Sequence, residues 1–359
     1  MNKNWKRRLL RSIALVLLLI TTSLWPETRA EGNGLTIHFL DVGQADAAIV
    51  LCDDEVLMID GGNVEDSSFV YAYLKGTLAL DHIDYMIGTH PHEDHIGGLS
   101  GALNACTVGT VFSPVTSYDS EEFENFKRYA EKQGTGLTVP SVGDTFTVGG
   151  ASVEFLAPVH AYENVNDLSL VVRIEYGETS FLFTGDAEGD SEHDMVDLGV
   201  DLSADVLKVA HHGSDTSSSY VFLREVMPNY AVISVGAGNA YDHPSLDTLS
   251  RLRDVGAVVY RTDQQGTILC KSDGEEITFS TERNIAPDTQ SGRVQRPGLE
   301  TALTDMTGDA PYIGNSNSYK FHYADCSSVE KMNAENKVEF FSREEAISAG
   351  YEPCKRCEP

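Results

Sequence analysis

Short apolar runs alternate with polar and amphipathic stretches from Leu35 to about Ser280. Turn-forming residues separate the first runs, LTIHFLDV, AAIVLC and EVLMID, so we expect three consecutive strands. Further strands are predicted over IDYMIGT, ASVEFLA, LSLVVRIEY, TSFLFTG, ADVLKVA, YAVISVG, AVVYRT, TILCK and EITFS. Helices are predicted over SSFVYAYLKG, after Asp186, and over SSYVFLREVM and SLDTLSRLRDVG. This alternation predicts an α/β domain with a mixed sheet covered by helices.

The two ends of the chain differ in composition from this middle part. Residues 1–30 begin with basic side chains, continue with the apolar run IALVLLLI and end in TRA, which predicts a cleaved signal peptide and a secreted, extracellular protein. An uncleaved membrane anchor is the alternative, although the apolar run is shorter than the roughly 20 residues that a span requires. Residues 284–309 are rich in Pro, Thr, Asp and Gly, which predicts a linker between a large domain, residues 34–283, and a small one, residues 310–359.

The chain is strongly acidic, with 26 Lys and Arg against 55 Asp and Glu among 359 residues. Cleavage after Ala30 would leave 20 Lys and Arg against 54 Asp and Glu. A surface of this sign repels nucleic acids unless metal ions or a local basic patch compensate. The apolar content of 41% is sufficient for a packed core, in which we expect Cys52, Cys106 and Cys270 as small buried side chains.

Three histidines and two acids lie together between His90 and His95, directly after the predicted strand IDYMIGT. Nitrogen and oxygen donors of this kind suit Zn²⁺, Mn²⁺ or Fe. Their number exceeds what one catalytic ion with an open coordination position needs, so the sequence predicts two divalent ions, Zn or Mn. A solvated loop that is merely rich in histidine would hold mutually repelling groups together without a reason.

The spacing of this cluster resembles the H-x-H-x-D-H signature of the metallo-β-lactamase superfamily. The segments HFLDVGQADAAIV, LMIDGG, THPHEDHIGGL, NDLSLVVRI, FLFTGDAE, LKVAHHGS and VYRTDQQGTI together look like the branch that contains the C-terminal nuclease domain of the competence protein ComEC and its exported relatives. The resemblance covers about 250 residues, from Leu35 to Ser280. It departs from the pattern at Ala45, where the branch has Gly, and at Asp242, which replaces a Gly before His243.

The resemblance implies an αββα sandwich with a binuclear metal centre. One metal site would use His90 and His92, and the second would use Asp94, His95 and a later histidine. Asp186 would bridge the two ions, and Asp94 is also counted among the catalytic residues.

Several further residues have roles that the resemblance leaves more open. Asp60 matches the carboxylate that supports the metal-binding loop, and Asp46 is either a supporting residue or an ordinary turn aspartate. His211 is assigned as a metal ligand and His212 as a residue that hydrogen-bonds a substrate phosphate or protonates a leaving oxygen, although the two roles could be exchanged. His243 either completes the second metal site, acts as that acid or is a plain loop histidine.

The chemistry implied is hydrolysis of a phosphodiester by a water molecule held between two ions about 3.5 to 4 Å apart. We expect a DNase first, with DNA as its partner, and a phosphodiesterase for cell-envelope or lipid-headgroup esters as the alternative. A lactamase is less favoured because the bridging position is Asp186. A surface nucleic-acid-binding protein with a vestigial metal site is a further alternative. We expect no protein partner, and no stable membrane partner beyond export.

The C-terminal segment contains a second set of metal-binding side chains, His322, Cys326, Cys354 and Cys357. Four such donors in two pairs are what a closed tetrahedral Zn²⁺ site needs, and a segment this small needs such a cross-link for stability. The segments CSSV and PCKRC resemble the zinc-binding domain of the Ada repair protein, with His322 in place of a cysteine. The sequence predicts one structural zinc ion, and a disulfide from Cys326 to one of the pair is the alternative.

Overall fold

The computed structural model of the chain describes residues 34–288, 312–324, 326–340 and 343–357. The predicted signal peptide and most of the predicted linker lie outside these residues. Within the described ranges, none of the helices has the length and apolar character needed to cross a membrane.

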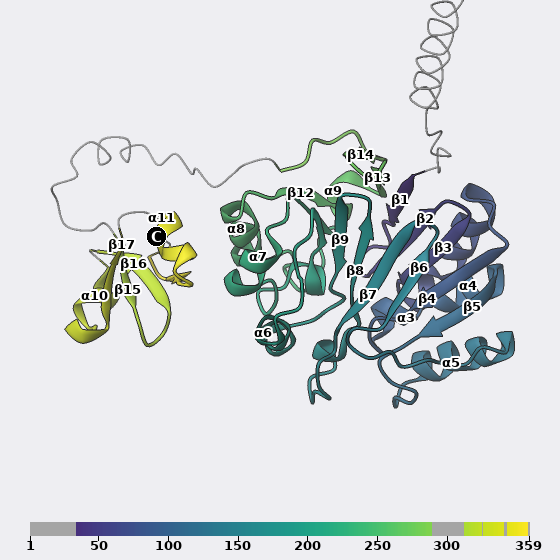
Figure 1. The fold of residues 1–359 in the computed structure, drawn as a ribbon, viewed down its shortest axis with the longest axis horizontal. Coiled ribbons are helices and arrows are strands. Elements are labelled where there is room, and N and C mark those ends of the chain that lie inside the picture. Colours follow the sequence, from purple (N-terminus) through teal and green to yellow (C-terminus); the bar gives the residue numbers. More distant parts are fainter. Residues whose placement is uncertain (1–33, 289–311, 325, 341–342, 358–359) are drawn as a thin grey trace, which may run out of the picture.

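Two seven-stranded sheets form the large domain (Figure 1). The first sheet has the order β14 (Ile277–Thr281), β13 (Ile268–Ser272), β1 (Leu35–Phe39), β2 (Ala47–Cys52), β3 (Glu55–Gly61), β4 (His82–Ile87) and β5 (Thr107–Phe112). The second has the order β12 (Val258–Arg261), β11 (Tyr230–Ile233), β10 (Val206–Lys208), β9 (Thr179–Phe183), β8 (Val171–Tyr176), β7 (Ala151–Ala157) and β6 (Thr145–Val148). Each strand predicted from the sequence overlaps one of these.

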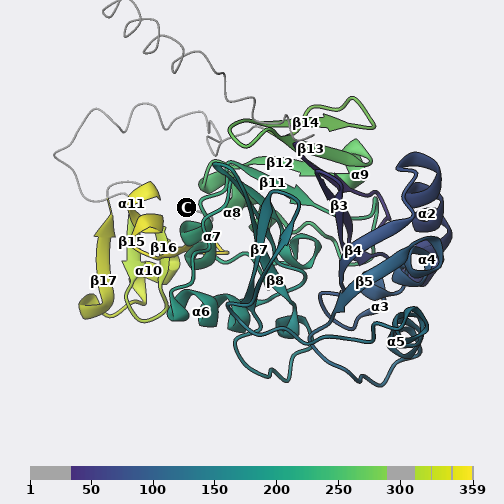
Figure 2. The same cartoon turned by 45° about the vertical axis from the view of Figure 1, so that its right-hand side comes forward.

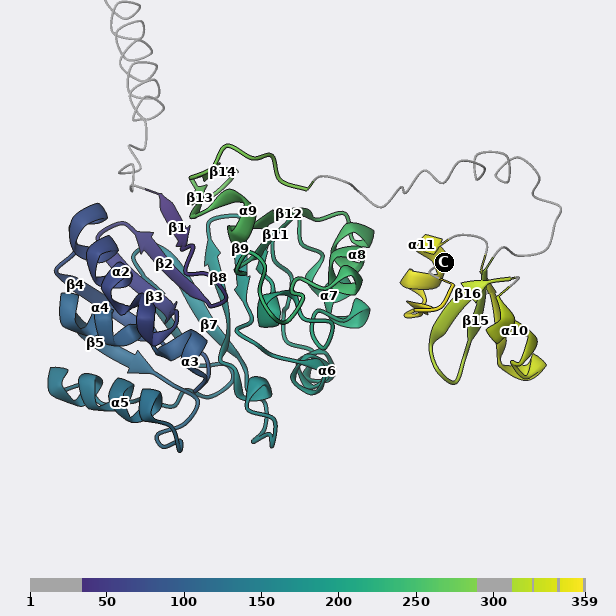
Figure 3. The same ribbon diagram turned by 180° about the vertical axis from the view of Figure 1, so that it is seen from behind.

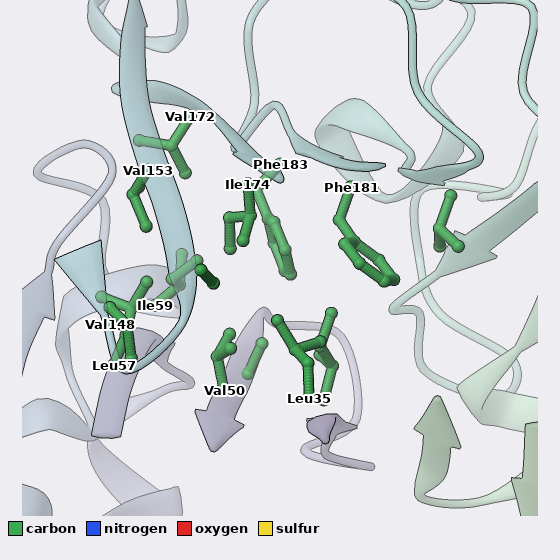
Figure 4. Close-up of a cluster of buried hydrophobic side chains, with 14 of the residues drawn as sticks. Leu35, Val50, Leu57, Ile59, Val148, Val153, Val172, Ile174, Phe181 and Phe183 are labelled. Atoms are coloured by element: carbon green, nitrogen blue, oxygen red, sulfur yellow. The ribbon is translucent and has the colours of Figure 1, made fainter. Parts of the chain in front are cut away.

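The inner faces of the two sheets pack against each other through one apolar cluster. Leu35 and Val50 come from the first sheet, and Ile174 and Phe181 from the second, and Figure 4 shows these side chains pointing into the shared layer. All four are fully buried. Alternating apolar positions along strands of both sheets therefore produce the central core.

Helices cover the outer face of each sheet (Figures 2 and 3). The first sheet is covered by α2 (Ser67–Ala72), α4 (Leu99–Ala105) and α5 (Glu121–Gln133), and the second by α6 (Gly189–Leu198), α7 (Tyr220–Val226) and α8 (Leu246–Asp254). The four layers are those of an αββα sandwich, which confirms the predicted fold class. The sequence analysis did not identify α5, because only three side chains of this highly charged helix are buried, namely Phe123, Phe126 and Ala130.

Parallel neighbours in each sheet bring the predicted site residues to one edge of the sandwich. β3 and β4 pair in parallel, as do β9, β10 and β11. Because carboxyl ends of parallel strands lie at the same edge, the segments that follow β4, β9 and β10 meet there. These segments carry the H-x-H-x-D-H cluster, Asp186 and the His211–His212 pair.

The small C-terminal domain has its own sheet, in the order β17 (Lys337–Phe340), β15 (Tyr312–Asn315), β16 (Lys320–Tyr323) and β18 (Glu352–Pro353). Two short helices, α10 (Ser327–Glu330) and α11 (Arg343–Ser348), accompany it. Phe321, Phe340, Ala346 and Tyr351 form its apolar cluster. Four apolar side chains form only a small core, so the domain needs an additional source of stability.

Glu192 on α6 is a buried acid that fastens the loop before α7. Its carboxylate accepts the backbone N–H groups of Ser218 and Ser219. Burial nevertheless raises the pKa of Glu192 from 4.5 to about 7. The folded protein therefore keeps this proton to a higher pH than the unfolded chain does. Protonation of Glu192 thus contributes a free energy of folding that is fully present below about pH 4.5 and is lost as the pH rises through about 7.

We expect the melting temperature of the wild-type protein to fall relative to that of Glu192→Gln between pH 5 and pH 8, because only the wild type has a carboxylate that ionises there. The free energy involved is on the order of 3 kcal/mol. Calorimetry of both proteins across this range measures the difference, and Glu124→Gln, an exposed position on α5, is the control. Parallel pH profiles for wild type and Glu192→Gln would contradict the role of Glu192.

Candidate metal centre

Two consecutive glycines let the histidine cluster pack onto the end of β3. The short helix α3 (Glu93–Ile96) begins after His92 and is followed by Gly97 and Gly98. A Cβ atom on Gly98 would lie 1.9 Å from the carbonyl oxygen of Gly61, and one on Gly97 would lie 2.5 Å from a backbone nitrogen. The contact therefore requires glycine at both positions, which explains the GG that ends the sequence motif.

Asp60 anchors the histidine loop to the end of β3 through hydrogen bonds. It has a left-handed backbone (φ 58°) at the end of β3 and is fully buried. Its carboxylate accepts the Thr89 backbone N–H at 2.8 Å, the Thr89 hydroxyl at 2.7 Å and the His95 Nδ1–H at 2.8 Å. Because the Nδ1 proton of His95 is directed to Asp60, the Nε2 atom is left to face the centre. This is the supporting contact that the sequence predicts for Asp60.

Four of the predicted residues form one compact donor group, composed of Asp94, His95, Asp186 and His212. One ligand atom from each lies within 4.8 Å of the others. His95 Nε2 is 3.2 Å from Asp186 Oδ1, and His212 Nε2 is 3.2 Å from Asp94 Oδ2. Two carboxylates and two imidazoles at such distances suit a divalent cation.

His90 and His92 form a neighbouring group on the other side of Asp186. His90 Nε2 lies 3.0 Å from His92 Nδ1 and 3.8 Å from Asp186 Oδ2. The hydroxyl oxygen of Ser169, in the segment NDLSL, accepts the backbone N–H of Asp186 at 3.0 Å and lies within hydrogen-bond distance of His90 Nδ1, at 3.5 Å. Ser169 thus joins the two groups, a function that the motif did not reveal.

The burial and the charges of the donor set are suited to cation binding. His95 Nε2 and Asp186 Oδ1 are buried, lie 3.2 Å from each other and have no hydrogen bond to any other described residue. Burial would lower the pKa of His95, but the carboxylates of Asp186, Asp60 and Asp94 outweigh it and hold that pKa well above the usual range. Burial and the neighbouring His95 hold the pKa of His90 well below it. Buried donor atoms that face only each other, beside imidazoles whose pKa values are shifted in opposite directions, fit bound metal ions.

His211 and His212 both lie beside Asp186. His212 is 2% exposed and belongs to the compact donor group, which makes it a metal-ligand candidate in addition to the predicted ligand His211. His211 lies at the solvent-exposed flank, with Nδ1 3.0 Å from Glu188 Oε1 and Nε2 3.9 Å from Asp186 Oδ2. The hydrogen bond from His211 holds the pKa of Glu188 below its usual range.

A buried ion pair that the sequence motifs did not predict supports His212. Lys208, on β10, donates to Asp46 Oδ2 at 2.6 Å and to the carbonyl of Val209 at 3.0 Å. The other oxygen of Asp46 lies 3.2 Å from His212 Nδ1, which donates to the carbonyl of Ser234 at 3.0 Å. Asp46 therefore belongs to the support of the centre and is not an ordinary turn residue.

His243 lies beside the centre and outside the donor groups. Its ring centroid is 5.5 Å from that of His211, in an edge-to-face arrangement. Burial and the neighbouring His211 and His212 lower the pKa of His243. His160 is more remote: its exposed ring faces Asp194 on α6, at 3.8 Å.

The C-terminal domain brings its four predicted donors together. His322 lies in β16, Cys326 precedes α10, and Cys354 and Cys357 follow β18. Ligand atoms of all four lie within 4.8 Å of one another, and none of these cysteines forms a disulfide. The small domain thus has a Cys/His zinc-binding cluster, and the predicted core cysteines Cys52, Cys106 and Cys270 are buried free thiols.

Comparison with known proteins agrees with this geometry. Residues 40–237 match the model of the metallo-beta-lactamase superfamily, and residues 311–359 match that of the metal binding domain of Ada. The chain belongs to the metallo-beta-lactamase superfamily and is a metal-dependent hydrolase with an Ada-type domain at its C-terminal end.

Within the superfamily the chain is similar to competence proteins of the ComEC type, as the sequence motifs predict. ComE operon protein 3 of Bacillus subtilis (strain 168) is 29% identical over 275 residues, which cover 72% of this chain and 35% of that protein. Competence protein ComA of Neisseria gonorrhoeae is 31% identical over 262 residues, 72% of this chain and 35% of that protein. Recombination protein 2 of Haemophilus influenzae is 28% identical over 276 residues, 74% of this chain and 32% of that protein. The chain spans about a third of the length of these relatives.

We expect Lys208→Met to destabilise the protein by about 3–5 kcal/mol, because it leaves the buried Asp46 carboxylate without its cation. Addition of Asp46→Asn should recover most of this loss, since the double variant buries no unpaired charge. Urea unfolding of the chelator-treated proteins measures both effects. Equal stability of the single and double variants would show that the ion pair does not act as a unit.

Replacement of Cys354 by serine should remove one zinc equivalent from the full chain and unfold the small domain, because a three-donor site binds zinc more weakly than a closed tetrahedral one. Metal content by mass spectrometry measures the loss, and Cys106→Ala, which changes a buried cysteine far from this cluster in sequence, is the control. Zinc retained by Cys354→Ser would exclude the four-donor site.

Proposed function

We propose that this chain is a binuclear metal-dependent phosphodiesterase that cleaves DNA. The observation that carries the proposal is the position of Asp186 between two donor groups, His90 with His92 on one side and Asp94, His95 and His212 on the other. Its Oδ1 lies 3.2 Å from His95 Nε2, and its Oδ2 lies 3.8 Å from the Nε2 atoms of both His90 and His212. A carboxylate within reach of both groups can serve two cations at once.

Two bound divalent ions would supply Lewis acidity, neutralising charge on the phosphodiester and lowering the pKa of a water molecule between them. The chain's own residues orient the site and handle protons. Asp60 and the carbonyl of Ser234 accept from the Nδ1 atoms of His95 and His212 and so fix the orientation of these rings. We propose that His243, whose ring packs against that of His211, gives a proton to the leaving oxygen.

DNA is favoured as the substrate by two features that are independent of the centre. The relatives include proteins named for competence and recombination, and the small domain matches the metal binding domain of Ada. The strongly negative composition opposes binding of a polyanion, but up to four positive charges at a binuclear centre offset it locally.

The same acidity supports one competing function, a phosphodiesterase for small cell-envelope or lipid-headgroup esters. Such substrates need no extended basic track, and the sequence shows no basic stripe interleaved with aromatics in the hydrolase domain. In either case we propose that the protein acts outside the cytoplasm, as the composition of residues 1–30 indicates.

We expect Asp186→Asn and His92→Ala to lower metal-dependent hydrolysis at least about 100-fold and to lower metal content, because each removes a donor from the shared centre. The assay uses DNA, both as plasmid and as a single-stranded oligonucleotide, and bis(p-nitrophenyl) phosphate in parallel, with Mn²⁺, with Zn²⁺ and with chelator. His193→Ala, an exposed histidine on α6, is the control and should keep full activity.

Cleavage of both substrates supports the nuclease. Cleavage of the small ester alone would retain the metal chemistry and replace DNA with a small phosphodiester. Full activity of Asp186→Asn would exclude the shared-carboxylate centre.

A further inference from the structure

The residues of the centre differ in their exposure to solvent. His90, His95, Asp186 and His212 are buried, with side chains at most 3% exposed. The side chains of Asp94 and His211 are 31% and 24% exposed. His92 is partly exposed as well. A substrate therefore reaches the centre past Asp94, His92 and His211, and the residues that border His211 form part of the rim of its path.

His243 and Tyr241 extend this rim outward from His211. The ring of His243 packs against that of His211, and the ring of Tyr241 is stacked on that of His243, with centroids 5.7 Å apart and planes 27° from parallel. Tyr241 is 69% exposed. The three rings thus form a series from the metal centre to the surface, which ends in a large aromatic face available to a ligand.

Asn239 holds the loop that carries these rings in a defined shape. Its side-chain oxygen accepts the backbone N–H groups of Tyr241 and His243, at 3.0 and 3.1 Å. Its amide group donates to the carbonyls of Gly236 and His243, at 3.0 and 2.6 Å. The exposed tyrosine is therefore part of a preorganised loop, so little conformational entropy is lost when a ligand packs on it.

The charges near this loop disfavour recognition of a polyanion by salt bridges. Residues 236–247 contain no Lys or Arg and include Asp242 and Asp247. Stacking of a base on an aromatic ring requires no positive charge and tolerates any base sequence. The stretch beside the centre thus offers a nucleic acid an aromatic face in place of cations.

We propose that Tyr241 is the stacking platform for the nucleobase adjacent to the scissile phosphate, and that the substrate class is single-stranded nucleic acid. The inference rests on the proposed nuclease function. A base paired and stacked within a duplex cannot place its face on Tyr241 without leaving the helix, so an unpaired strand is the better substrate. Tyr241 determines which phosphodiesters bind, while His243 and the donor groups act on the phosphate.

The test uses dinucleotides, in which the only phosphodiester has a known neighbour. Thymidylyl-thymidine is compared with analogues in which either thymidine is replaced by an abasic tetrahydrofuran residue, and kcat/KM is measured for wild type, Tyr241→Ala and Tyr241→Phe. Wild type should prefer the natural dinucleotide over one of the abasic analogues by about tenfold or more. Tyr241→Ala should lose this preference through a higher KM and should cleave that analogue as wild type does.

Tyr241→Phe keeps the aromatic face and should restore the preference. Tyr71→Ala, an exposed tyrosine on α2, is the control and should behave as wild type. An equal loss on natural and abasic substrates in Tyr241→Ala, or no loss on either, would overturn the stacking role while leaving the nuclease intact. Cleavage of bis(p-nitrophenyl) phosphate without cleavage of any nucleic acid would overturn the proposed function and the platform with it.

Discussion

The convergence of four histidine nitrogens on one carboxylate is the arrangement on which the rest of the site depends. The Nε2 atoms of His95, His90, His212 and His211 lie 3.2, 3.8, 3.8 and 3.9 Å from Asp186. In His95, His211 and His212 the Nδ1 atom faces a protein oxygen, which fixes the proton there and leaves the Nε2 lone pair for the centre. The donors are thus oriented by the chain itself, and the order of the sheet edges places their loops around Asp186.

Such convergence carries an electrostatic cost that the surrounding residues offset only in part. Asp46, Asp60 and Asp186 are all at most 4% exposed, and isolated carboxylates at that depth are strongly unfavourable. Lys208 offsets one of them directly at 2.6 Å, and His95, whose pKa the surrounding carboxylates raise, offsets others. The excess of buried negative charge beyond these partners is what a cation would stabilise, so metal binding and stability of this edge of the sandwich are linked.

Much of the centre could be predicted from the sequence because its residues follow regular apolar strands. Asp60, the histidine cluster and Asp186 each come at the end of such a strand, and the motif spacing identified them. Lys208 could not be found in this way, because it lies within an apolar strand and its partner is 162 residues away. The burial of His212 relative to His211 could not be predicted from the sequence either. Both residues have left-handed backbones, with φ of 49° and 52°, and sequence spacing does not indicate which of two adjacent rings such a turn buries.

The acidic composition, which argues against a nucleic-acid substrate, is offset locally by a lysine of the small domain. Lys355 lies between the zinc ligands Cys354 and Cys357, and its Nζ is 2.7 Å from Asp247 and 3.3 Å from Asp215. Both pairs are exposed and contribute little stability. They matter for their position, because Asp215 follows the His211–His212 loop and is close enough to influence the pKa of His243. The zinc-binding loop thus places a cation beside two of the carboxylates that make this region negative.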